Sequence, residues 1–153
     1  MSENLSFLYC QKLVVLSTDH TAVLLARRKG EADFDGIYSL IGGKMETTDD
    51  SLLEGMRREK NEEVGTQVKL KVISHESYNI LFRKNDGNAM VLPHIAAEYI
   101  EGDVVLNEEY HDYLWVPVKD LDTFEPKIST IPQVTHWALQ RLSAASESDF
   151  TII

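Results

Sequence analysis

Residues 42–66 read GGKMETTDDSLLEGMRREKNEEVGT, and the fold is decided in this stretch. A pair of glycines leads into a short acidic loop, after which Asp50 or Ser51 is a good helix N-cap. Apolar residues then recur at helical spacing, and Gly65 is a natural left-handed stop. The pattern predicts a helix that runs from about Asp50 to Val64.

Three glutamates of this predicted helix, Glu59, Glu62 and Glu63, are spaced i, i+3 and i+4. Their side chains therefore leave the same side of the helix, and each like-charged pair opposes helix formation by roughly 0.2–0.5 kcal/mol. Arg58 neutralises only part of this negative charge, and a hard divalent cation such as Mg²⁺ would neutralise the rest. The alternative is a solvated acidic face, which is common in a chain this acidic.

The stretch resembles the signature of the Nudix hydrolase family, G-x5-E-x7-R-E-U-x-E-E-x-G-U, where U is a bulky aliphatic residue. Residues 58–66 match its second half. In the first half, counting back from Arg58 puts Asp50 at the acidic position, whereas counting forward from Gly43 puts Asp49 there. We infer a one-residue insertion close to the start of the helix.

Other positions depart from the family pattern without removing a metal ligand. Aspartate replaces glutamate at the acidic position, and Ile41 stands where many members carry proline. Lys60 and Thr66 occupy the two aliphatic positions. Because the first of these usually packs under the helix, we expect the methylene stem of Lys60 to lie on the core while its ammonium reaches water.

The resemblance implies a role for each matching residue. Glu59 and Glu63 are expected to be direct Mg²⁺ ligands, the carbonyl of Gly43 a further ligand, and Glu62 a ligand or near-ligand. Arg58 is expected to orient them through charge-assisted hydrogen bonds. Mg²⁺ is thus the expected cofactor, with Mn²⁺ as an alternative.

A second resemblance lies near residues 107–118. Many Nudix proteins carry an acidic, often histidine-bearing loop before a strand of the form aromatic-x-Trp-Val, which residues 113–116 match. In several subfamilies that loop supplies one more metal ligand or a general base. Counting back from the tryptophan favours Glu109, with Glu108 and His111 behind it, and a solvated loop is the alternative.

The family resemblance implies hydrolysis of a pyrophosphate bond in a nucleoside diphosphate linked to a group X. Nucleoside triphosphates and nucleotide sugars are the expected substrates. A carboxylate near the bound water is expected to take its proton, and Glu62, Glu63 and Glu109 are the candidates. The alternative function is a catalytically silent Nudix-fold module that binds a nucleotide or scaffolds a partner, which the intact glutamate set disfavours.

The remaining segments predict an α/β protein. The resemblance implies an α/β/α sandwich with a mixed central sheet, flanked by the catalytic helix and a C-terminal helix. Arg27, at the end of the second strand, is a candidate for contact with substrate phosphate or an ordinary solvated strand end, and His94 is given no role. The expected strands are Leu5–Ser17, Thr21–Arg27, Gln67–His75, Ser77–Phe82, Ala89–Tyr99 and Tyr113–Val116. The expected C-terminal helix is Gln133–Leu142.

Length and charge bound the remaining possibilities. The 153 residues are expected to form one domain, 1–153, whose residues 143–153 are a loose tail or a contact in a homodimer. A net charge of −10 argues against a general nucleic-acid binder. No leader or apolar run of about 20 residues is seen, so we expect a cytoplasmic protein without a membrane segment. Cys10 stands alone and is expected to be a buried, inert thiol.

Overall fold

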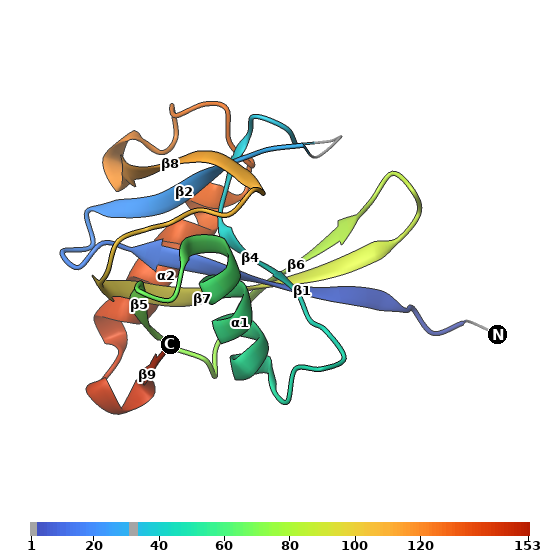
Figure 1. Ribbon diagram of the computed structural model, residues 1–153, viewed down its shortest axis with the longest axis horizontal. Helices are drawn as coiled ribbons and strands as arrows, with labels where there is room; N and C mark the ends of the chain where they lie inside the picture. The colour runs from blue at the N-terminus through green and yellow to red at the C-terminus, as the bar shows by residue number, and fades with distance from the viewer. Residues whose placement is uncertain (1–2, 31–33) are drawn as a thin grey trace.

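The computed structural model describes residues 3–30 and 34–153 and shows a mixed sheet between two helices (Figure 1). The helices are α1 (Leu52–Val64) and α2 (Ile131–Ala144), with short 3₁₀ turns η1 (Val118–Asp120) and η2 (Glu147–Asp149). The strands are β1 (Phe7–Leu16), β2 (Ala22–Arg28), β3 (Tyr38–Ser39), β4 (Ile41–Lys44), β5 (Lys69–Val72), β6 (Tyr78–Arg83), β7 (Ala89–Glu101), β8 (Tyr110–Pro117) and β9 (Thr151–Ile152). The expected mixed α/β architecture is confirmed.

The sheet forks beside its long strand β1. The main strand order is β3-β2-β1-β7-β5-β9, with β4 on β1, β6 on β7 and β8 on β2. β1 runs parallel to β7 and antiparallel to both β2 and β4. Its Cys10–Leu13 half pairs with β4, whereas its end pairs with β2 at Leu16. One side of β1 therefore changes partner, and the sheet opens at that point.

Two apolar cores lie on the two faces of the sheet. Strand residues alternate between them, so Leu24 and Ala26 of β2 pack in the core beneath α1, while Val23 and Leu25 pack in the core beneath α2. Figure 1 shows α1 and α2 on opposite sides of the sheet. Neither helix in the described part of the chain is long and apolar enough to cross a membrane.

Helix α1 has the ends that its sequence predicts. The Ser51 side chain accepts a hydrogen bond from the backbone N–H of Glu54 at 3.1 Å, which makes Ser51 the N-cap. Gly65 ends the helix with φ of 96°, and its N–H bonds to the carbonyl of Asn61. Local signals within the stretch thus set both ends of α1.

Lys60 corrects one expectation, because its ammonium does not reach water. The residue is only 1% exposed, and its Nζ donates to the carbonyl of Val68 at 2.7 Å. The chain turns back beneath α1 after Gly65 and supplies this acceptor. Burial lowers the pKa of Lys60 to about 8.

The buried lysine predicts a pH-dependent stability difference between the wild type and Lys60→Met. In the range between about 8 and the ordinary lysine pKa of 10.5, the unfolded chain holds a proton that the folded chain has released. Raising the pH therefore favours the folded wild type by at most ~1.4 kcal/mol per pH unit. Urea unfolding at pH 7 to 10 measures this difference. Above pH 8 the unfolding free energy of the wild type should rise relative to that of Lys60→Met. The same pH dependence in both proteins would contradict the prediction.

The C-terminal segment corrects a second expectation, since residues 143–153 do not form a loose tail. Strand β9 pairs with β5, and the backbones of Leu70 and Ile153 exchange two hydrogen bonds of 3.0 and 2.9 Å. Ile153 is 3% exposed and joins the core beneath α1. The apolar end is ordered because it covers the edge of β5 in its own chain.

Candidate functional site

The first part of the site lies at the fork of the sheet, where β4 meets α1. The Glu63 carboxylate accepts a hydrogen bond from the backbone N–H of Gly42 at 2.6 Å, and Glu63 is 2% exposed. Burial raises the pKa of Glu63 to about 8, whereas the Gly42 hydrogen bond and the charge of Lys12 lower it. An acid in such surroundings is ionised more readily when a cation lies beside it.

Gly43 allows a second carboxylate to approach the same backbone. A Cβ atom on Gly43 would lie 2.2 to 2.5 Å from the carboxyl atoms of Glu59, so only glycine leaves room for that carboxyl group. Burial raises the pKa of Glu59, and Arg58 opposes this shift. The Glu59 carboxylate and the Gly43 backbone thus form one oxygen-rich corner.

Arg58 holds the acidic side chains around this corner. Its Nη1 donates to Glu59 at 2.9 Å and to Glu62 at 3.3 Å. Its Nε and Nη2 grip the two oxygens of Asp49 at 2.7 and 2.9 Å, which holds the pKa of Asp49 down at about 2. This pairing favours Asp49 for the acidic position of the signature, with the extra residue between it and Arg58.

The loop before β8 brings Glu109 toward the two glutamates. The charge of Glu109 raises the pKa of both Glu59 and Glu63. In residues 3–30 and 34–153 the Glu109 carboxylate makes no hydrogen bond or ion pair, although its backbone carbonyl accepts from the N–H of Lys29 at 2.8 Å. His111 instead pairs with Asp35 at 3.5 Å. Of the loop candidates, Glu109 is the one coupled to the site.

The donor set suits a hard divalent cation. Glu59, Glu63, Glu62 and the Gly43 carbonyl offer oxygen atoms, which Mg²⁺ prefers, and the glycine at position 43 keeps the corner free of a side chain. Among the residues that the structure describes, no three acidic, histidine or cysteine side chains are gathered closely enough to hold a metal ion. Ligation therefore requires these carboxylates to move closer together than they lie in this structure.

Neighbouring arginines of β2 serve opposite faces of the sheet. Arg27 forms a two-pronged pair with Asp112, with N–O distances of 3.2 and 2.7 Å, and Asp112 also accepts from Tyr38 on the α2 side. Arg28 lies on the other side, where its charge lowers the pKa of Cys10 and Tyr110. Contact of Arg27 with phosphate stays a prediction that requires its pair with Asp112 to open. In the sequence, the alternation of β2 indicates that Arg27 and Arg28 lie on opposite faces of the sheet, but it does not indicate which face carries the site.

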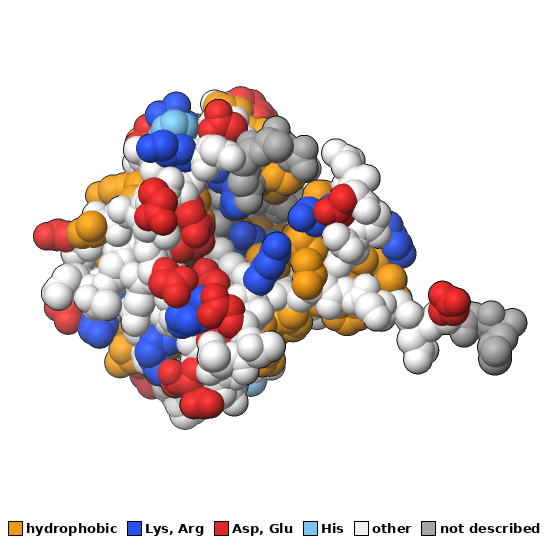
Figure 2. All heavy atoms as spheres, turned by 45° about the vertical axis from the view of Figure 1, so that its right-hand side comes forward, with side chains coloured by type: hydrophobic (Ala, Val, Ile, Leu, Met, Phe, Trp, Pro, Cys, Tyr) orange, Lys and Arg blue, Asp and Glu red, His pale blue; other side chains and the backbone are white. Residues whose placement is uncertain are grey.

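Lys12 is a further residue that the sequence reasoning missed. It faces Gly42 in the β1–β4 ladder, and its charge lowers the pKa of Glu63. Within the described ranges its ammonium makes no hydrogen bond or ion pair. Figure 2 shows Asp and Glu side chains gathered beside a hollow, with Lys and Arg side chains at its floor. The Lys12 ammonium, which has no partner among the described residues and lies near clustered acids, suits an anionic substrate.

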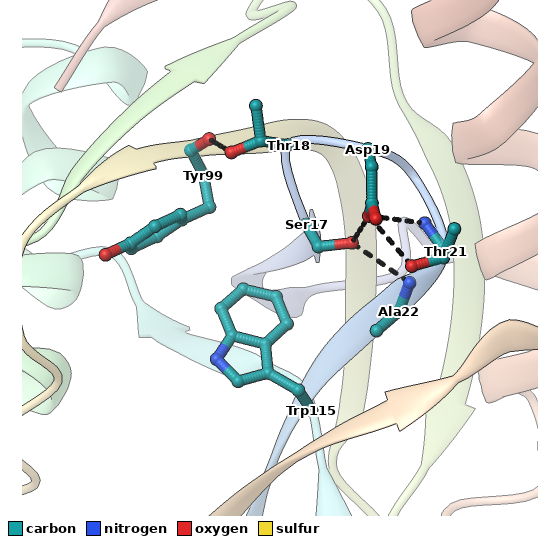
Figure 3. Close-up of a pocket in the computed structure, with 7 residues that line it drawn as sticks. All are labelled: Ser17, Thr18, Asp19, Thr21, Ala22, Tyr99 and Trp115. Carbon is teal, nitrogen blue, oxygen red and sulfur yellow. Dashed lines mark hydrogen bonds between the residues drawn. The ribbon is translucent and has the colours of Figure 1, made fainter.

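A second hollow of about 690 Å³ lies at the turn between β1 and β2 and shares no residue with this corner. In Figure 3 the Asp19 carboxylate accepts hydrogen bonds from the Ser17 and Thr21 hydroxyls, both at 2.8 Å. The rings of Tyr99 and Trp115 close the other side at 5.5 Å between centroids. The polar groups serve the turn itself, so the acidic corner remains the candidate site.

Most of the chain is similar to a known protein family and to known proteins. The NUDIX domain family model matches residues 12–138. The chain is 29% identical over 109 residues to "Nucleoside triphosphatase NudI" of Klebsiella pneumoniae, which covers 63% of this chain and 73% of that protein. It is 27% identical over 123 residues to the protein of the same name from Escherichia coli O81, which covers 76% of this chain and 86% of that protein.

Solved structures share the fold at lower identity. The MutT protein of Methanosarcina mazei Go1 matches with a TM-score of 0.70 and 22% identity over 91% of this chain and 97% of that one. The NUDIX domain of Shewanella oneidensis NrtR, solved with ADP ribose, matches with a TM-score of 0.69 and 22% identity over 90% and 89%. A C. elegans Ap4A hydrolase matches with a TM-score of 0.72 and 14% identity over 90% and 99%.

Proposed function

The chain belongs to the NUDIX family of pyrophosphate hydrolases, and from this membership we propose that it catalyses Mg²⁺-dependent hydrolysis of a nucleoside triphosphate. One observation carries the proposal, namely that Glu59 lies against Gly43 and Glu63 accepts from the Gly42 N–H at the fork of the sheet. The names of the NudI relatives favour a triphosphate over a nucleotide sugar, which stays the second candidate. Mn²⁺ is the proposed substitute for Mg²⁺.

The proposed reaction is attack of water on one phosphorus atom of the pyrophosphate linkage. The new P–O bond replaces the bond to the bridging oxygen, and phosphate or pyrophosphate leaves with that oxygen. When bound, Mg²⁺ supplies charge for the diphosphate oxygens and acidifies water. Glu59, Glu63 and the Gly43 carbonyl are the residues that hold it, with Glu62 close by. Arg58 keeps Glu59 in place through its 2.9 Å hydrogen bond. The chain's contribution is thus mainly position and charge.

We propose Glu109 as the general base among the three candidates. In the structure Glu62 is engaged with Arg58 and Glu63 with the Gly42 N–H, whereas the Glu109 carboxylate has no partner in the described part of the chain. Glu109 also lies near enough to affect both Glu59 and Glu63. An unengaged carboxylate beside the site is well placed to accept the proton of the attacking water.

Lys12 is proposed to contact substrate phosphate, and Lys12→Gln tests this. A hydrogen bond to a charged group contributes about 1.5–3 kcal/mol, so we expect the substrate KM to rise at least ~10-fold with a smaller effect on kcat. Lys119→Gln removes the same charge from exposed η1 and is expected to leave KM unchanged. Equal KM values for Lys12→Gln and the wild type argue against the contact.

Chromatographic analysis of the products from a substrate panel tests the proposed function, because the different substrates release nucleotides, sugar phosphates, phosphate or pyrophosphate. The panel contains nucleoside triphosphates, nucleotide sugars, dinucleoside polyphosphates and ADP-ribose, each with Mg²⁺, with Mn²⁺ and with excess chelator. Metal-dependent cleavage is expected, fastest with a triphosphate. No cleavage of any compound, together with measurable nucleotide binding, favours the second candidate function, a silent nucleotide-binding module.

Three further properties stay predictions from the sequence. They are a cytoplasmic location, the absence of nucleic-acid partners and a homodimer. Ile153 docks in its own chain, so this residue is not available for contact with a second copy. Exposed apolar residues instead gather on the arm formed by the start of β1 and by β6, including Phe7, Leu81 and Phe82.

A further inference from the structure

Tyr110 carries a buried hydroxyl group that makes no hydrogen bond to any described residue. It is the first residue of β8 and is 5% exposed, and its ring lies in the core beneath α1. In residues 3–30 and 34–153 its Oη has no hydrogen-bond partner. A buried polar group left unpaired costs about 1–3 kcal/mol, and most such groups are paired in folded proteins. The hydroxyl therefore calls for a functional explanation.

The backbone ties Tyr110 to the end of the catalytic helix. The N–H of Asn107 donates to the carbonyl of Glu63 at 3.3 Å, and the N–H of Tyr110 donates to the carbonyl of Asn107 at 3.4 Å. Burial and the charge of Glu63 raise the pKa of Tyr110, while the charge of Arg28 lowers it. The loop thus places a phenol against a proposed metal ligand.

The Glu63 carboxyl group has capacity for a second donor. Its Oε2 accepts from the Gly42 N–H at 2.6 Å, and its Oε1 accepts no hydrogen bond from any other described residue. A hydrogen bond from O–H to an ionised carboxylate is about twice as strong as one between neutral groups. Oε1 of Glu63 therefore offers the Tyr110 hydroxyl the partner that it lacks among the described residues.

We propose that Tyr110 is a positioning residue, whose hydroxyl donates to Glu63 when Glu63 ligates the divalent cation. The Gly42 N–H and the Tyr110 hydroxyl then hold the carboxylate from two sides and fix its orientation toward the cation. Hydrogen bonds behind a metal ligand commonly change metal affinity or activity by 10–100-fold. This inference rests on the proposed function of the same site.

Tyr110→Phe tests the role because it removes only the hydroxyl. Mn²⁺ affinity of the protein alone is measured by titration calorimetry and by the electron paramagnetic resonance signal of free Mn²⁺. We expect the affinity to fall ~10-fold and kcat to fall similarly with substrate KM unchanged. Urea unfolding without metal is expected to show equal or higher stability, because an unpaired buried hydroxyl has been removed.

Tyr113→Phe, on the exposed part of β8, is the matched control and is expected to behave as the wild type. Unchanged Mn²⁺ affinity in Tyr110→Phe overturns the inference. So does a loss of metal-free stability that accompanies the weaker binding, because it shows a purely structural role. Binding is measured without substrate, so a protein that binds Mn²⁺ but cleaves nothing refutes the proposed function separately.

Discussion

Glu63→Gln is expected to lower kcat by at least ~10³-fold while the fold is retained. The change removes one charge and keeps the volume of the side chain nearly constant. Glutamine still presents a carbonyl oxygen to the Gly42 N–H, which Glu63 binds at 2.6 Å. Initial rates on the best substrate of the panel, with Mg²⁺ varied, measure the loss.

The control for this variant is Glu54→Gln, which removes the same charge from the first turn of α1. Glu54 pairs with Arg57 and takes no part in the acidic corner, so its loss should leave kcat near the wild-type value. Equal unfolding midpoints for all three proteins show that the fold is intact. Near-normal Mg²⁺-dependent rates in Glu63→Gln contradict its assignment as a ligand.

Gly43→Ala and Gly42→Ala are expected to fail in different ways. At Gly43 the new methyl group meets only the carboxyl end of Glu59, a flexible side chain that moves aside. The fold should survive, and displacement of the carboxylate by about 1 Å is expected to cost ~10²-fold in kcat. At Gly42, φ is +132° and the methyl group would lie 2.1 Å from the backbone oxygen of Gln11.

Gly42→Ala is therefore expected to lose ~3 kcal/mol or more of unfolding free energy, because neither the backbone angle nor the β1–β4 pairing tolerates a side chain there. Urea unfolding and kcat measured together separate the two glycines. A wild-type kcat in Gly43→Ala contradicts the claim that turnover depends on the position of the Glu59 carboxylate beside Gly43. A stable Gly42→Ala contradicts the packing at the fork.

Local signals account for the parts of the structure that the sequence predicted well. Helix α1 begins after Ser51 and stops at Gly65 because its caps lie within the helix segment itself. Strand-forming residues and turn signals likewise located most of the long strands. Strand β9 was missed because its two residues pair with Lys71 and Val72, which lie about 80 positions earlier in the chain.

Long-range packing decided the features that the sequence left open or misplaced. The signature can be counted forward from Gly43 to Asp49 or backward from Arg58 to Asp50. The hydrogen bonds from Arg58 to Asp49 favour the forward count. Arg27 and Arg28 are both basic and adjacent, and the two faces of β2 could not be told apart before the cores were known. Lys60 found a carbonyl partner that no spacing rule predicts.

Crystals grown with Mn²⁺ and a non-cleavable nucleoside triphosphate analogue test the central claim most directly. Anomalous scattering at the manganese edge locates the ion independently of any assumed mechanism. The account predicts a peak between the carboxylates of Glu59 and Glu63 and the Gly43 carbonyl, in contact with the phosphates. Active crystals with no ion at this corner, and with Glu59 and Glu63 still bonded only to Arg58 and to the Gly42 N–H, contradict it.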